Sequence, residues 1–182
     1  MKLVIGLVGR IGSGKGAVTE HLCSGYGASR HVISDILADV LDRLYLPRNR
    51  ENLQALGKAL RAELGSSVIV DALKKDIGGD NAGIIVVDGI RYVNEVEMLR
   101  CFDNNLLVSI DAPPEVRYER CKIRGQKNET NITFEEFLNS GKQETEKYIG
   151  ETEKLADYRI DNSGSLKDLH EKVNEILSKY NL

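Results

Sequence analysis

The most informative part of this chain is LVIGLVGRIGSGKG (Leu3–Gly16). Its first part, Leu3–Val8, is a short apolar run, which is typical of a buried strand. Three glycines follow at positions 9, 12 and 14, and Lys15 comes directly after the last of them. A helical pattern begins near that lysine. The stretch therefore predicts a strand, a glycine-rich loop and a helix in immediate succession.

This loop matches G-x-x-x-x-G-K, the Walker A pattern, in the structural context that the pattern requires. Glycine allows backbone angles that turn successive N–H groups towards one anion, and the positive end of the following helix adds to the attraction. We therefore expect the loop to bind ATP, with Lys15 reaching the β- and γ-phosphates. The residues assigned to this contact are Gly9, Arg10, Ile11, Gly12, Ser13, Gly14, Lys15, Gly16 and Ala17. An ordinary glycine-rich turn is the alternative.

The end of the loop departs from the usual pattern. Walker A loops usually continue with Ser or Thr, whose hydroxyl contacts Mg²⁺, whereas this chain has Gly16 and Ala17. We expect Mg²⁺ to bind with ATP and to be held by phosphates, by waters and, through water, by Asp88. Asp88 follows Ile84–Val87, a run that predicts a strand buried on both faces. Open α/β sheets bind ligands at the carboxyl ends of their strands. A helix cap is the alternative role of Asp88.

Length and composition fit one domain, residues 1–182. The apolar fraction of 41% and the charged fraction of 29% are near globular averages, which argues against disorder. A net charge of −3 argues against a nucleic-acid partner. The three cysteines lie far apart without a metal or disulfide pattern, and Leu3–Val8 is too short to cross a membrane. We expect a cytoplasmic protein without a membrane partner, either a monomer or a small homo-oligomer.

Short β-branched runs alternate with amphipathic stretches of helical period. This alternation predicts a parallel sheet covered on both faces. Strands are expected at about 2–8, 31–33, 83–88, 105–110 and 157–161. Helices are expected at about 15–24, 34–46, 51–75 with a break near Gly65, 92–102, 113–124, 133–148 and 165–180. Candidate N-caps are Ser34, Asp111, Thr133 and Ser165.

Three further segments resemble nucleoside-monophosphate-kinase-like P-loop kinases. RENLQALG (Arg50–Gly57) is similar to the acceptor-side helix of deoxynucleoside monophosphate kinases, and DGIRYVNE (Asp88–Glu95) to their D-x-R-x-x-N-E segment. ADYRIDNSGS (Ala156–Ser165) resembles the last strand and nucleotide loop of dephospho-CoA kinases. The resemblance covers nearly the whole chain. It implies a three-layer α/β/α fold, a five-stranded parallel sheet in the order 2-3-1-4-5, and a short lid over about 117–135.

The same resemblance implies where both substrates bind. The base of ATP would lie near Arg120, Asn162 and Gly164. The acceptor would lie among five residues: Asp35, Arg50, Gln54, Gly57 and Arg91. Asp35 would orient or deprotonate the attacking oxygen, although an acidic residue in the first turn of a helix is also favourable by itself.

Helical geometry supports the acceptor-side assignment independently. One face of the expected helix carries Arg50, Gln54, Gly57 and Arg61, and a separate stripe carries Leu53, Leu56, Leu60 and Leu64. We expect the leucines to pack on the core. A glycine in mid-helix costs about 1 kcal/mol of stability relative to Ala. We therefore interpret Gly57 as a position without a side chain, where the acceptor can approach the helix closely. A solvated face is the alternative.

The expected helix after Pro113 carries Arg117, Arg120 and Arg124 on one face, with Val116 and Ile123 on the side expected to be buried. Phosphoryl transfer depends on positioning and charge neutralisation, and the arginine fork binds phosphate oxygens in pairs. The resemblance places such arginines at the edge of a lid, here GQKNETN (Gly125–Asn131). A basic, solvated helix is the alternative.

The residues assigned to catalysis are Lys15, Asp35, Asp88, Arg120 and Arg124. The acidic residues Glu144, Glu146, Glu151 and Glu153 are interpreted as a solvated face. His21, His31 and His170 share no metal-ligand spacing and are interpreted as structural or surface residues.

Together these features predict an enzyme that transfers the γ-phosphoryl group of Mg-ATP to a small nucleotide, first of all a (deoxy)nucleoside monophosphate. Dephospho-CoA is the alternative acceptor, favoured by the C-terminal segment. A regulatory protein that binds ATP without turnover is a second alternative, favoured only by the missing hydroxyl after Lys15.

Overall fold

Five parallel strands form the centre of the protein in the computed structural model, which describes residues 2–125, 132–140 and 148–181. The strands are β1 (Leu3–Val8), β2 (Ser29–His31), β3 (Ile84–Ile90), β4 (Asn105–Asp111) and β5 (Tyr158–Asp161). Their order in the sheet is β2-β3-β1-β4-β5, and every neighbouring pair is parallel. The predicted strand order is confirmed.

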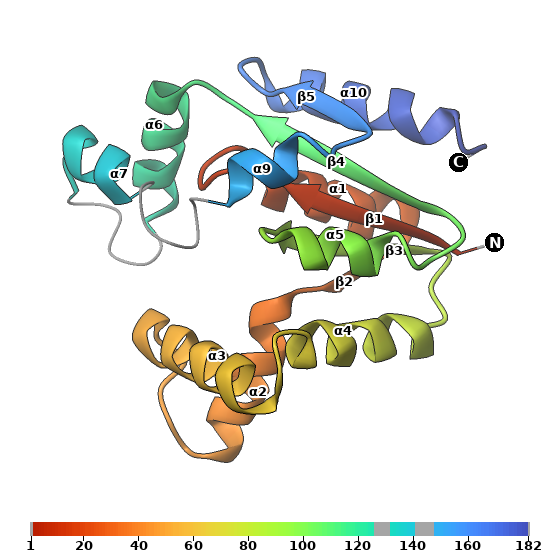
Figure 1. Ribbon diagram of the computed structural model, residues 1–182. Coiled ribbons are helices and arrows are strands. Elements are labelled where there is room, and N and C mark those ends of the chain that lie inside the picture. Colours follow the sequence, from red (N-terminus) through yellow and green to blue (C-terminus); the bar gives the residue numbers. More distant parts are fainter. Residues whose placement is uncertain (1, 126–131, 141–147, 182) are drawn as a thin grey trace.

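Helices cover both faces of this sheet (Figure 1). The helices are α1 (Lys15–Tyr26), α2 (Ile33–Arg43), α3 (Arg50–Leu64), α4 (Val68–Gly79), α5 (Val93–Leu99), α6 (Pro114–Arg124), α7 (Phe134–Ser140), α9 (Ile149–Glu153) and α10 (Leu166–Ser178). Helices α1 and α10 pack on one face, and α4, α5 and α9 on the other. Helices α2 and α3 extend beyond the β2 edge, and α6 and α7 lie beyond the carboxyl end of β4. The predicted three-layer fold is confirmed.

Strand β1 is buried on both faces because its side chains alternate between the two layers of helices. Leu3, Ile5 and Leu7 face α1 and α10, whereas Val4 and Val8 pack with α4 and α5. A Cβ at position 6, which is glycine, would lie 2.7 Å from a methyl carbon of Leu99 in α5. The absence of a side chain at this position therefore lets α5 approach the sheet closely.

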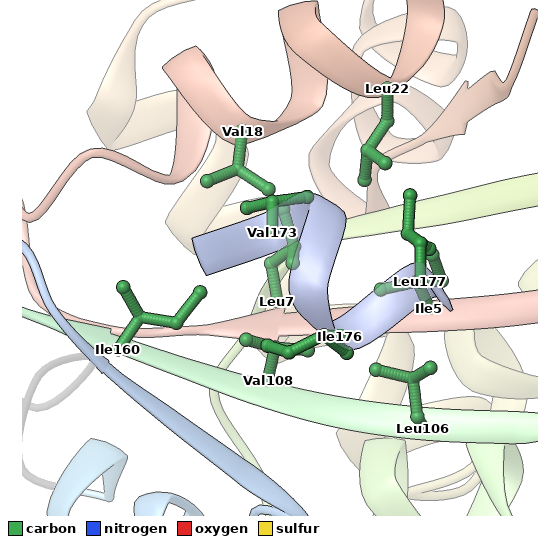
Figure 2. Close-up of a pocket in the computed structure, with 10 residues that line it drawn as sticks. All are labelled: Ile5, Leu7, Val18, Leu22, Leu106, Val108, Ile160, Val173, Ile176 and Leu177. Atoms are coloured by element: carbon green, nitrogen blue, oxygen red, sulfur yellow. The ribbon is translucent and has the colours of Figure 1, made fainter. Parts of the chain in front are cut away.

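A small apolar cavity lies between the sheet and helices α1 and α10 (Figure 2). Its lining residues are Ile5, Leu7, Val18, Leu22, Leu106, Val108, Ile160, Val173, Ile176 and Leu177. The cavity has a volume of about 10 Å³, which is at the lower limit for one water, and it offers almost no polar partner. It is therefore part of the packed core and not a ligand site.

The β2–α2 connection corrects two predicted boundaries. Strand β2 spans Ser29–His31 and α2 already begins at Ile33. The Asp35 N–H donates to the Val32 carbonyl oxygen at 3.0 Å, so the first turn closes ahead of Ser34. The prediction that Ser34 caps this helix is therefore wrong.

The start of α6 corrects another predicted cap. Asp111 is the last residue of β4, and Pro113 precedes the helix, which begins at Pro114. A proline in the first turn loses no helical hydrogen bond because its missing N–H would have no partner there. The prediction that Asp111 caps α6 is wrong. By contrast, Ser165 accepts from the Asp168 N–H and caps α10 as predicted.

The expected helix 133–148 is only partly described. Thr133 and Glu136 exchange hydrogen bonds at the start of α7, as expected for the predicted cap at Thr133. Residues 141–147 lie outside the described residues, and so do Glu144 and Glu146. A separate short helix, α9, follows and was not predicted.

The apolar faces of α3 and α6 are less buried than predicted. On α3 only Gly57 is buried, Leu53, Leu56 and Leu60 are half-buried, and Leu64 is 64% exposed. On α6 Ile123 is 85% exposed. Both helices lie at the periphery of the molecule, so a helical stripe of apolar residues there does not meet the central core.

Candidate active site

The glycine-rich loop between β1 and α1 has the backbone conformation that the sequence predicts. Gly9, Gly12 and Gly14 have φ values of 152°, 78° and 112°, which residues with a side chain rarely adopt. Space is limiting as well, because a Cβ on Gly12 would lie 3.0 Å from the Arg117 Cα. The loop therefore requires glycine both for its turn and for the approach of α6.

Lys15 lies over this loop. Its Nζ donates to the Gly9 carbonyl oxygen at 2.6 Å and to the Arg10 carbonyl oxygen at 3.2 Å. The ammonium group is thus held at the mouth of the loop, at the N-terminus of α1. Gly16 is exposed, and Ala17, in the first turn of α1, packs against the core. The structure therefore brings Lys15 to the loop, but no hydroxyl follows it.

Asn162 joins the loop after β5 to the glycine-rich loop. Its Nδ2 donates to the Ser13 carbonyl oxygen at 2.8 Å, and only 4% of Asn162 is exposed. Arg120 Nη2 donates to the Gly164 carbonyl oxygen at 3.3 Å. Arg120 Nη1 is buried without a hydrogen-bond partner among the described residues. The predicted nucleotide-side residues Arg120, Asn162 and Gly164 are therefore brought together.

The three arginines of α6 have different surroundings. Arg117 is 8% exposed and donates to the carbonyl oxygens of Ala112 and Ile11 at 3.0 and 3.2 Å. Its guanidinium also lies 5.5 Å from the ring centre of Phe137. Arg120 is half-buried and Arg124 is exposed. Arg117 therefore connects α6 to the loop and to α7, whereas the segment 126–131 of the expected lid lies outside the described residues.

Asp88 lies within β3 and not at its end, since the strand continues to Ile90. Leu7 pairs with Asp88 but Val8 pairs with Ile90, so Gly89, with a φ of 84°, is an extra residue in the strand. Such a bulge redirects neighbouring side chains and is frequent beside active sites. The Asp88 side chain is 17% exposed, which leaves its carboxylate accessible near the carboxyl end of the strand.

Arg30 connects two of the predicted acidic residues. Its guanidinium lies 3.7 Å from a carboxylate oxygen of Asp88 and 3.7 Å from one of Asp35. The Asp35 side chain is 60% exposed and that of Arg30 is 47% exposed. Sequence reasoning missed Arg30 because no motif contains it and because the second strand was expected to begin only at residue 31.

The predicted acceptor residues of α3 differ in their exposure to solvent. Arg50 and Gln54 are exposed, whereas Gly57 is buried. A Cβ on Gly57 would lie 3.2 Å from a Leu37 methyl carbon and 3.0 Å from an Arg61 nitrogen. The space beside Gly57 is therefore filled by α2 and by the Arg61 side chain. The interpretation that this space is open to the acceptor is wrong.

Arg91 is held in place through its backbone. Its N–H donates to Glu95 Oε2 at 2.7 Å, and its carbonyl oxygen accepts from Thr152 Oγ1 at 2.9 Å. Glu95 is 2% exposed. Burial raises the pKa of Glu95, opposed by the N–H groups of Arg91 and Tyr92 and by the charges of Arg91 and Arg61. Arg61 lies 5.6 Å from the ring centre of Tyr92. Arg61 and Arg91 thus both lie near this buried carboxylate.

Within the described parts of the chain, no group of three or more His, Cys, Asp or Glu residues is arranged to hold a metal ion. No helix in these parts is long and apolar enough to cross a membrane. His31 contacts Asp80 at 2.8 Å, and His21 stacks on His170 with ring centres 4.0 Å apart.

This chain is similar to known proteins over nearly its whole length. The AAA domain family matches residues 5–148. A UPF0200 protein of Hyperthermus butylicus is 31% identical over 98% of this chain and 95% of its own length. The chain belongs to the UPF0200 family. UPF0200 protein PH1008 of Pyrococcus horikoshii is 32% identical over 97% of both chains. These UPF0200 names state no substrate.

Solved structures show the same fold. TT1252 from Thermus thermophilus is similar with a TM-score of 0.63 and 20% identity, over 98% of this chain and 97% of that chain. Shikimate kinase from Acinetobacter baumannii, in complex with shikimate, has a TM-score of 0.58 and 16% identity over 100% and 96% of the two chains. The UPF0200 chain therefore has a P-loop kinase-like fold. The matches do not single out the nucleoside monophosphate or dephospho-CoA kinase branch.

Proposed function

We propose that this protein is a phosphotransferase that moves the γ-phosphoryl group of Mg-ATP to a small nucleotide. The observation that carries the proposal is the loop Gly9–Lys15, with three glycines at positive φ and Lys15 over its mouth. Such a loop at a helix N-terminus binds phosphate through backbone N–H groups and the helix dipole. The P-loop kinase-like fold is consistent with that role.

The ATP phosphates would lie over residues 9–17, and the base would lie beside Arg120, Asn162 and Gly164. The buried Nη1 of Arg120, which has no partner among the described residues, supports this placement. A buried donor without a partner is costly unless a ligand satisfies it. Arg124, at the exposed end of α6, would neutralise charge on the phosphoryl group together with Lys15.

The residues present fit a magnesium ion held mainly by ATP. Asp88 offers an accessible carboxylate near the carboxyl end of β3, and Mg²⁺ commonly keeps several waters and uses one or two carboxylates. Asp88 would therefore hold the ion through water. The bound ion would neutralise phosphate charge. Arg30, at 3.7 Å, would keep the Asp88 carboxylate oriented.

The acceptor would lie on the α2 and α3 side, between Asp35 and Arg91, with Arg50 and Gln54 at its rim. Asp35 is exposed enough to reach an acceptor oxygen, and the backbone of Arg91 is held from two sides. A (deoxy)nucleoside monophosphate is the first choice, because the segments Arg50–Gly57 and Asp88–Glu95 resemble the acceptor side of deoxynucleoside monophosphate kinases. Arginine forks there would bind its phosphate. Dephospho-CoA is the alternative acceptor.

A protein that binds ATP without turnover is a second candidate. One observation favours it: neither Gly16 nor Ala17 can supply the hydroxyl that usually contacts Mg²⁺.

One assay distinguishes these candidates. The purified chain is incubated with Mg-ATP and a panel of nucleoside monophosphates, deoxynucleoside monophosphates and dephospho-CoA, and both ATP binding and ADP release are measured. We expect release that depends on one class of nucleotide. ATP binding without acceptor-dependent release would favour the non-catalytic candidate, and absence of ATP binding would contradict both.

A further inference from the structure

Helix α9 brings one acidic side chain to the phosphate loop. The helix packs against β1 and α5, with Ile149 in the core and Thr152 fully buried. Thr152 Oγ1 donates to the Arg91 carbonyl oxygen at 2.9 Å. Figure 1 shows α9 beside the end of β1. Glu153, the last residue of α9, is therefore fixed by its helix next to the loop.

Glu153 is half-buried, which corrects its interpretation as part of a solvated face. Its Oε1 is buried and accepts no hydrogen bond from any described residue. A buried oxygen without a donor is unfavourable, and such exceptions in a folded protein call for an explanation. Glu151, two residues earlier on the same helix, is exposed.

Charged groups approach Glu153 from several elements. Asp111 at the end of β4 repels its carboxylate, whereas Arg10 and Lys15 of the loop and Arg159 of β5 attract it. Burial and then Asp111 raise the pKa of Glu153, and the three cations oppose this only in part.

Helix α5, which also packs against α9, contributes Glu95. That carboxylate accepts from the N–H groups of Arg91 and Tyr92. It is therefore committed to the backbone at the start of α5.

We propose that Glu153 is a positioning residue of the phosphate loop: its carboxylate balances Arg10 and Lys15, and it gains a proton when a nucleoside triphosphate binds. This inference rests on the proposed function, because it requires ATP at the loop. Bound phosphates and the Glu153 carboxylate are both anionic, so they compete for the same two cations. The proton comes from solvent and binds one carboxylate oxygen, which removes the repulsion.

The experiment measures Mg-ATP affinity and proton uptake by calorimetry, using the full chain in buffers of different ionisation enthalpy. Measurements run between about pH 6 and about pH 8, because proton linkage makes affinity depend on pH where a group titrates. The variants are Glu153→Gln and the matched control Glu151→Gln. Titration of ATP itself is common to all three proteins and therefore cancels in the comparison.

We expect wild type and Glu151→Gln to take up protons on binding and to lose affinity as the pH rises. Glu153→Gln should take up fewer protons on binding than these two proteins. It should also bind Mg-ATP about fivefold more tightly near pH 8, since one nearby negative charge is removed. Equal affinity and equal uptake in all three proteins would overturn the inference. So would weaker binding by Glu153→Gln, because that result would make Glu153 a contributor to ligand binding.

A second variant covers the case in which Glu153→Gln does not fold. Asp111→Asn removes the carboxylate that raises the pKa of Glu153, so the pH dependence should move to lower pH. An unchanged profile would contradict the inference. Failure of the wild type to bind Mg-ATP at any pH would instead contradict the proposed function, so the two failures are distinguishable.

Discussion

The Arg30 guanidinium lies 3.7 Å from a carboxylate oxygen of Asp88. This contact joins the edge strand β2 to the neighbouring strand β3 at the carboxyl end of the sheet. Arg30 also lies 3.7 Å from Asp35. An arginine between two carboxylates reduces their mutual repulsion and orients both. The proposed metal-side and acceptor-side acids are therefore electrostatically coupled.

Asp88→Asn should raise the magnesium concentration needed for half-maximal phosphotransfer. The amide keeps the shape of the side chain but loses the charge that would attract the ion's waters. Magnesium titrations of activity measure this midpoint. Asp103→Asn, at an exposed loop position, serves as the control. An unchanged midpoint and kcat in Asp88→Asn would leave Asp88 with a structural role only.

Lys15→Ala should lower kcat by about 10²–10³-fold, the loss typical of removing one charge-stabilising donor. The fold should persist, because the side chain of Lys15 is not part of the apolar core. Steady-state kinetics and a thermal melt test both points. Lys74→Ala on the exposed surface of α4 is the control. Retention of more than about a tenth of wild-type kcat would argue against the loop assignment.

Arg91→Ala and Arg50→Ala should raise the KM of the acceptor more than the KM of ATP. Loss of a charge-assisted contact to phosphate typically costs about 1.5–3 kcal/mol, or at least about tenfold in affinity. Acceptor and ATP titrations on each variant measure the two constants. Arg43→Ala, at the exposed end of α2, is the control. A larger rise in the KM of ATP would mean that the substrates lie on opposite sides from those proposed.

Gly57→Ala should lower the free energy of unfolding by up to about 2 kcal/mol. The gain in helix propensity is about 1 kcal/mol, but overpacking costs about 1–3 kcal/mol, and the new Cβ would lie 3.2 Å from Leu37. Chemical denaturation measures the change. Gly78→Ala on α4, where nothing lies within 4 Å of the new Cβ, should be neutral or stabilising. Stabilisation by both substitutions would show that the α2–α3 contact is loose.

Asp80 should contribute acid-sensitive stability. The nearby Ser29 hydroxyl, the Ala82 N–H and His31 lower the pKa of Asp80 from 3.8 to about 2. Because the folded-state pKa is lowered, the contribution is complete above about pH 4 and is lost as the pH falls towards about 2. The shift corresponds to at most about 2.4 kcal/mol, and solvent screening of this partly exposed group reduces the contribution further. Denaturation of wild type and Asp80→Asn across this range should show a difference that shrinks with acidification. A constant difference would contradict the assignment.

The phosphate loop and the order of elements were predictable from local sequence. Strand β1, the glycines at positions 9, 12 and 14, and Lys15 are contiguous, so a short-range pattern describes them completely. The buried run of β3 was equally clear, because a strand covered on both faces lacks polar alternation. Asn162, Arg120 and Gly164 were placed by resemblance, and the structure brings them together.

Contacts between distant segments could not be predicted in this way. Arg30 meets Asp88 across two strands, and Leu37 covers Gly57 from another helix. The burial of Glu153 depends on where α9 packs, although neighbouring glutamates have the same local sequence character.

The strand–loop–helix unit follows from local sequence alone, because backbone conformation and anion binding there depend on residues adjacent in the chain. The exposure of polar side chains and the pairing of charges depend instead on how distant segments pack together. The bulge at Gly89 places Asp88 within its strand, and the packing of α6 turns Arg117 into a structural contact while leaving Ile123 exposed. Burial and electrostatic pairing depend on distances between segments, and periodicity along one segment contains no information about those distances.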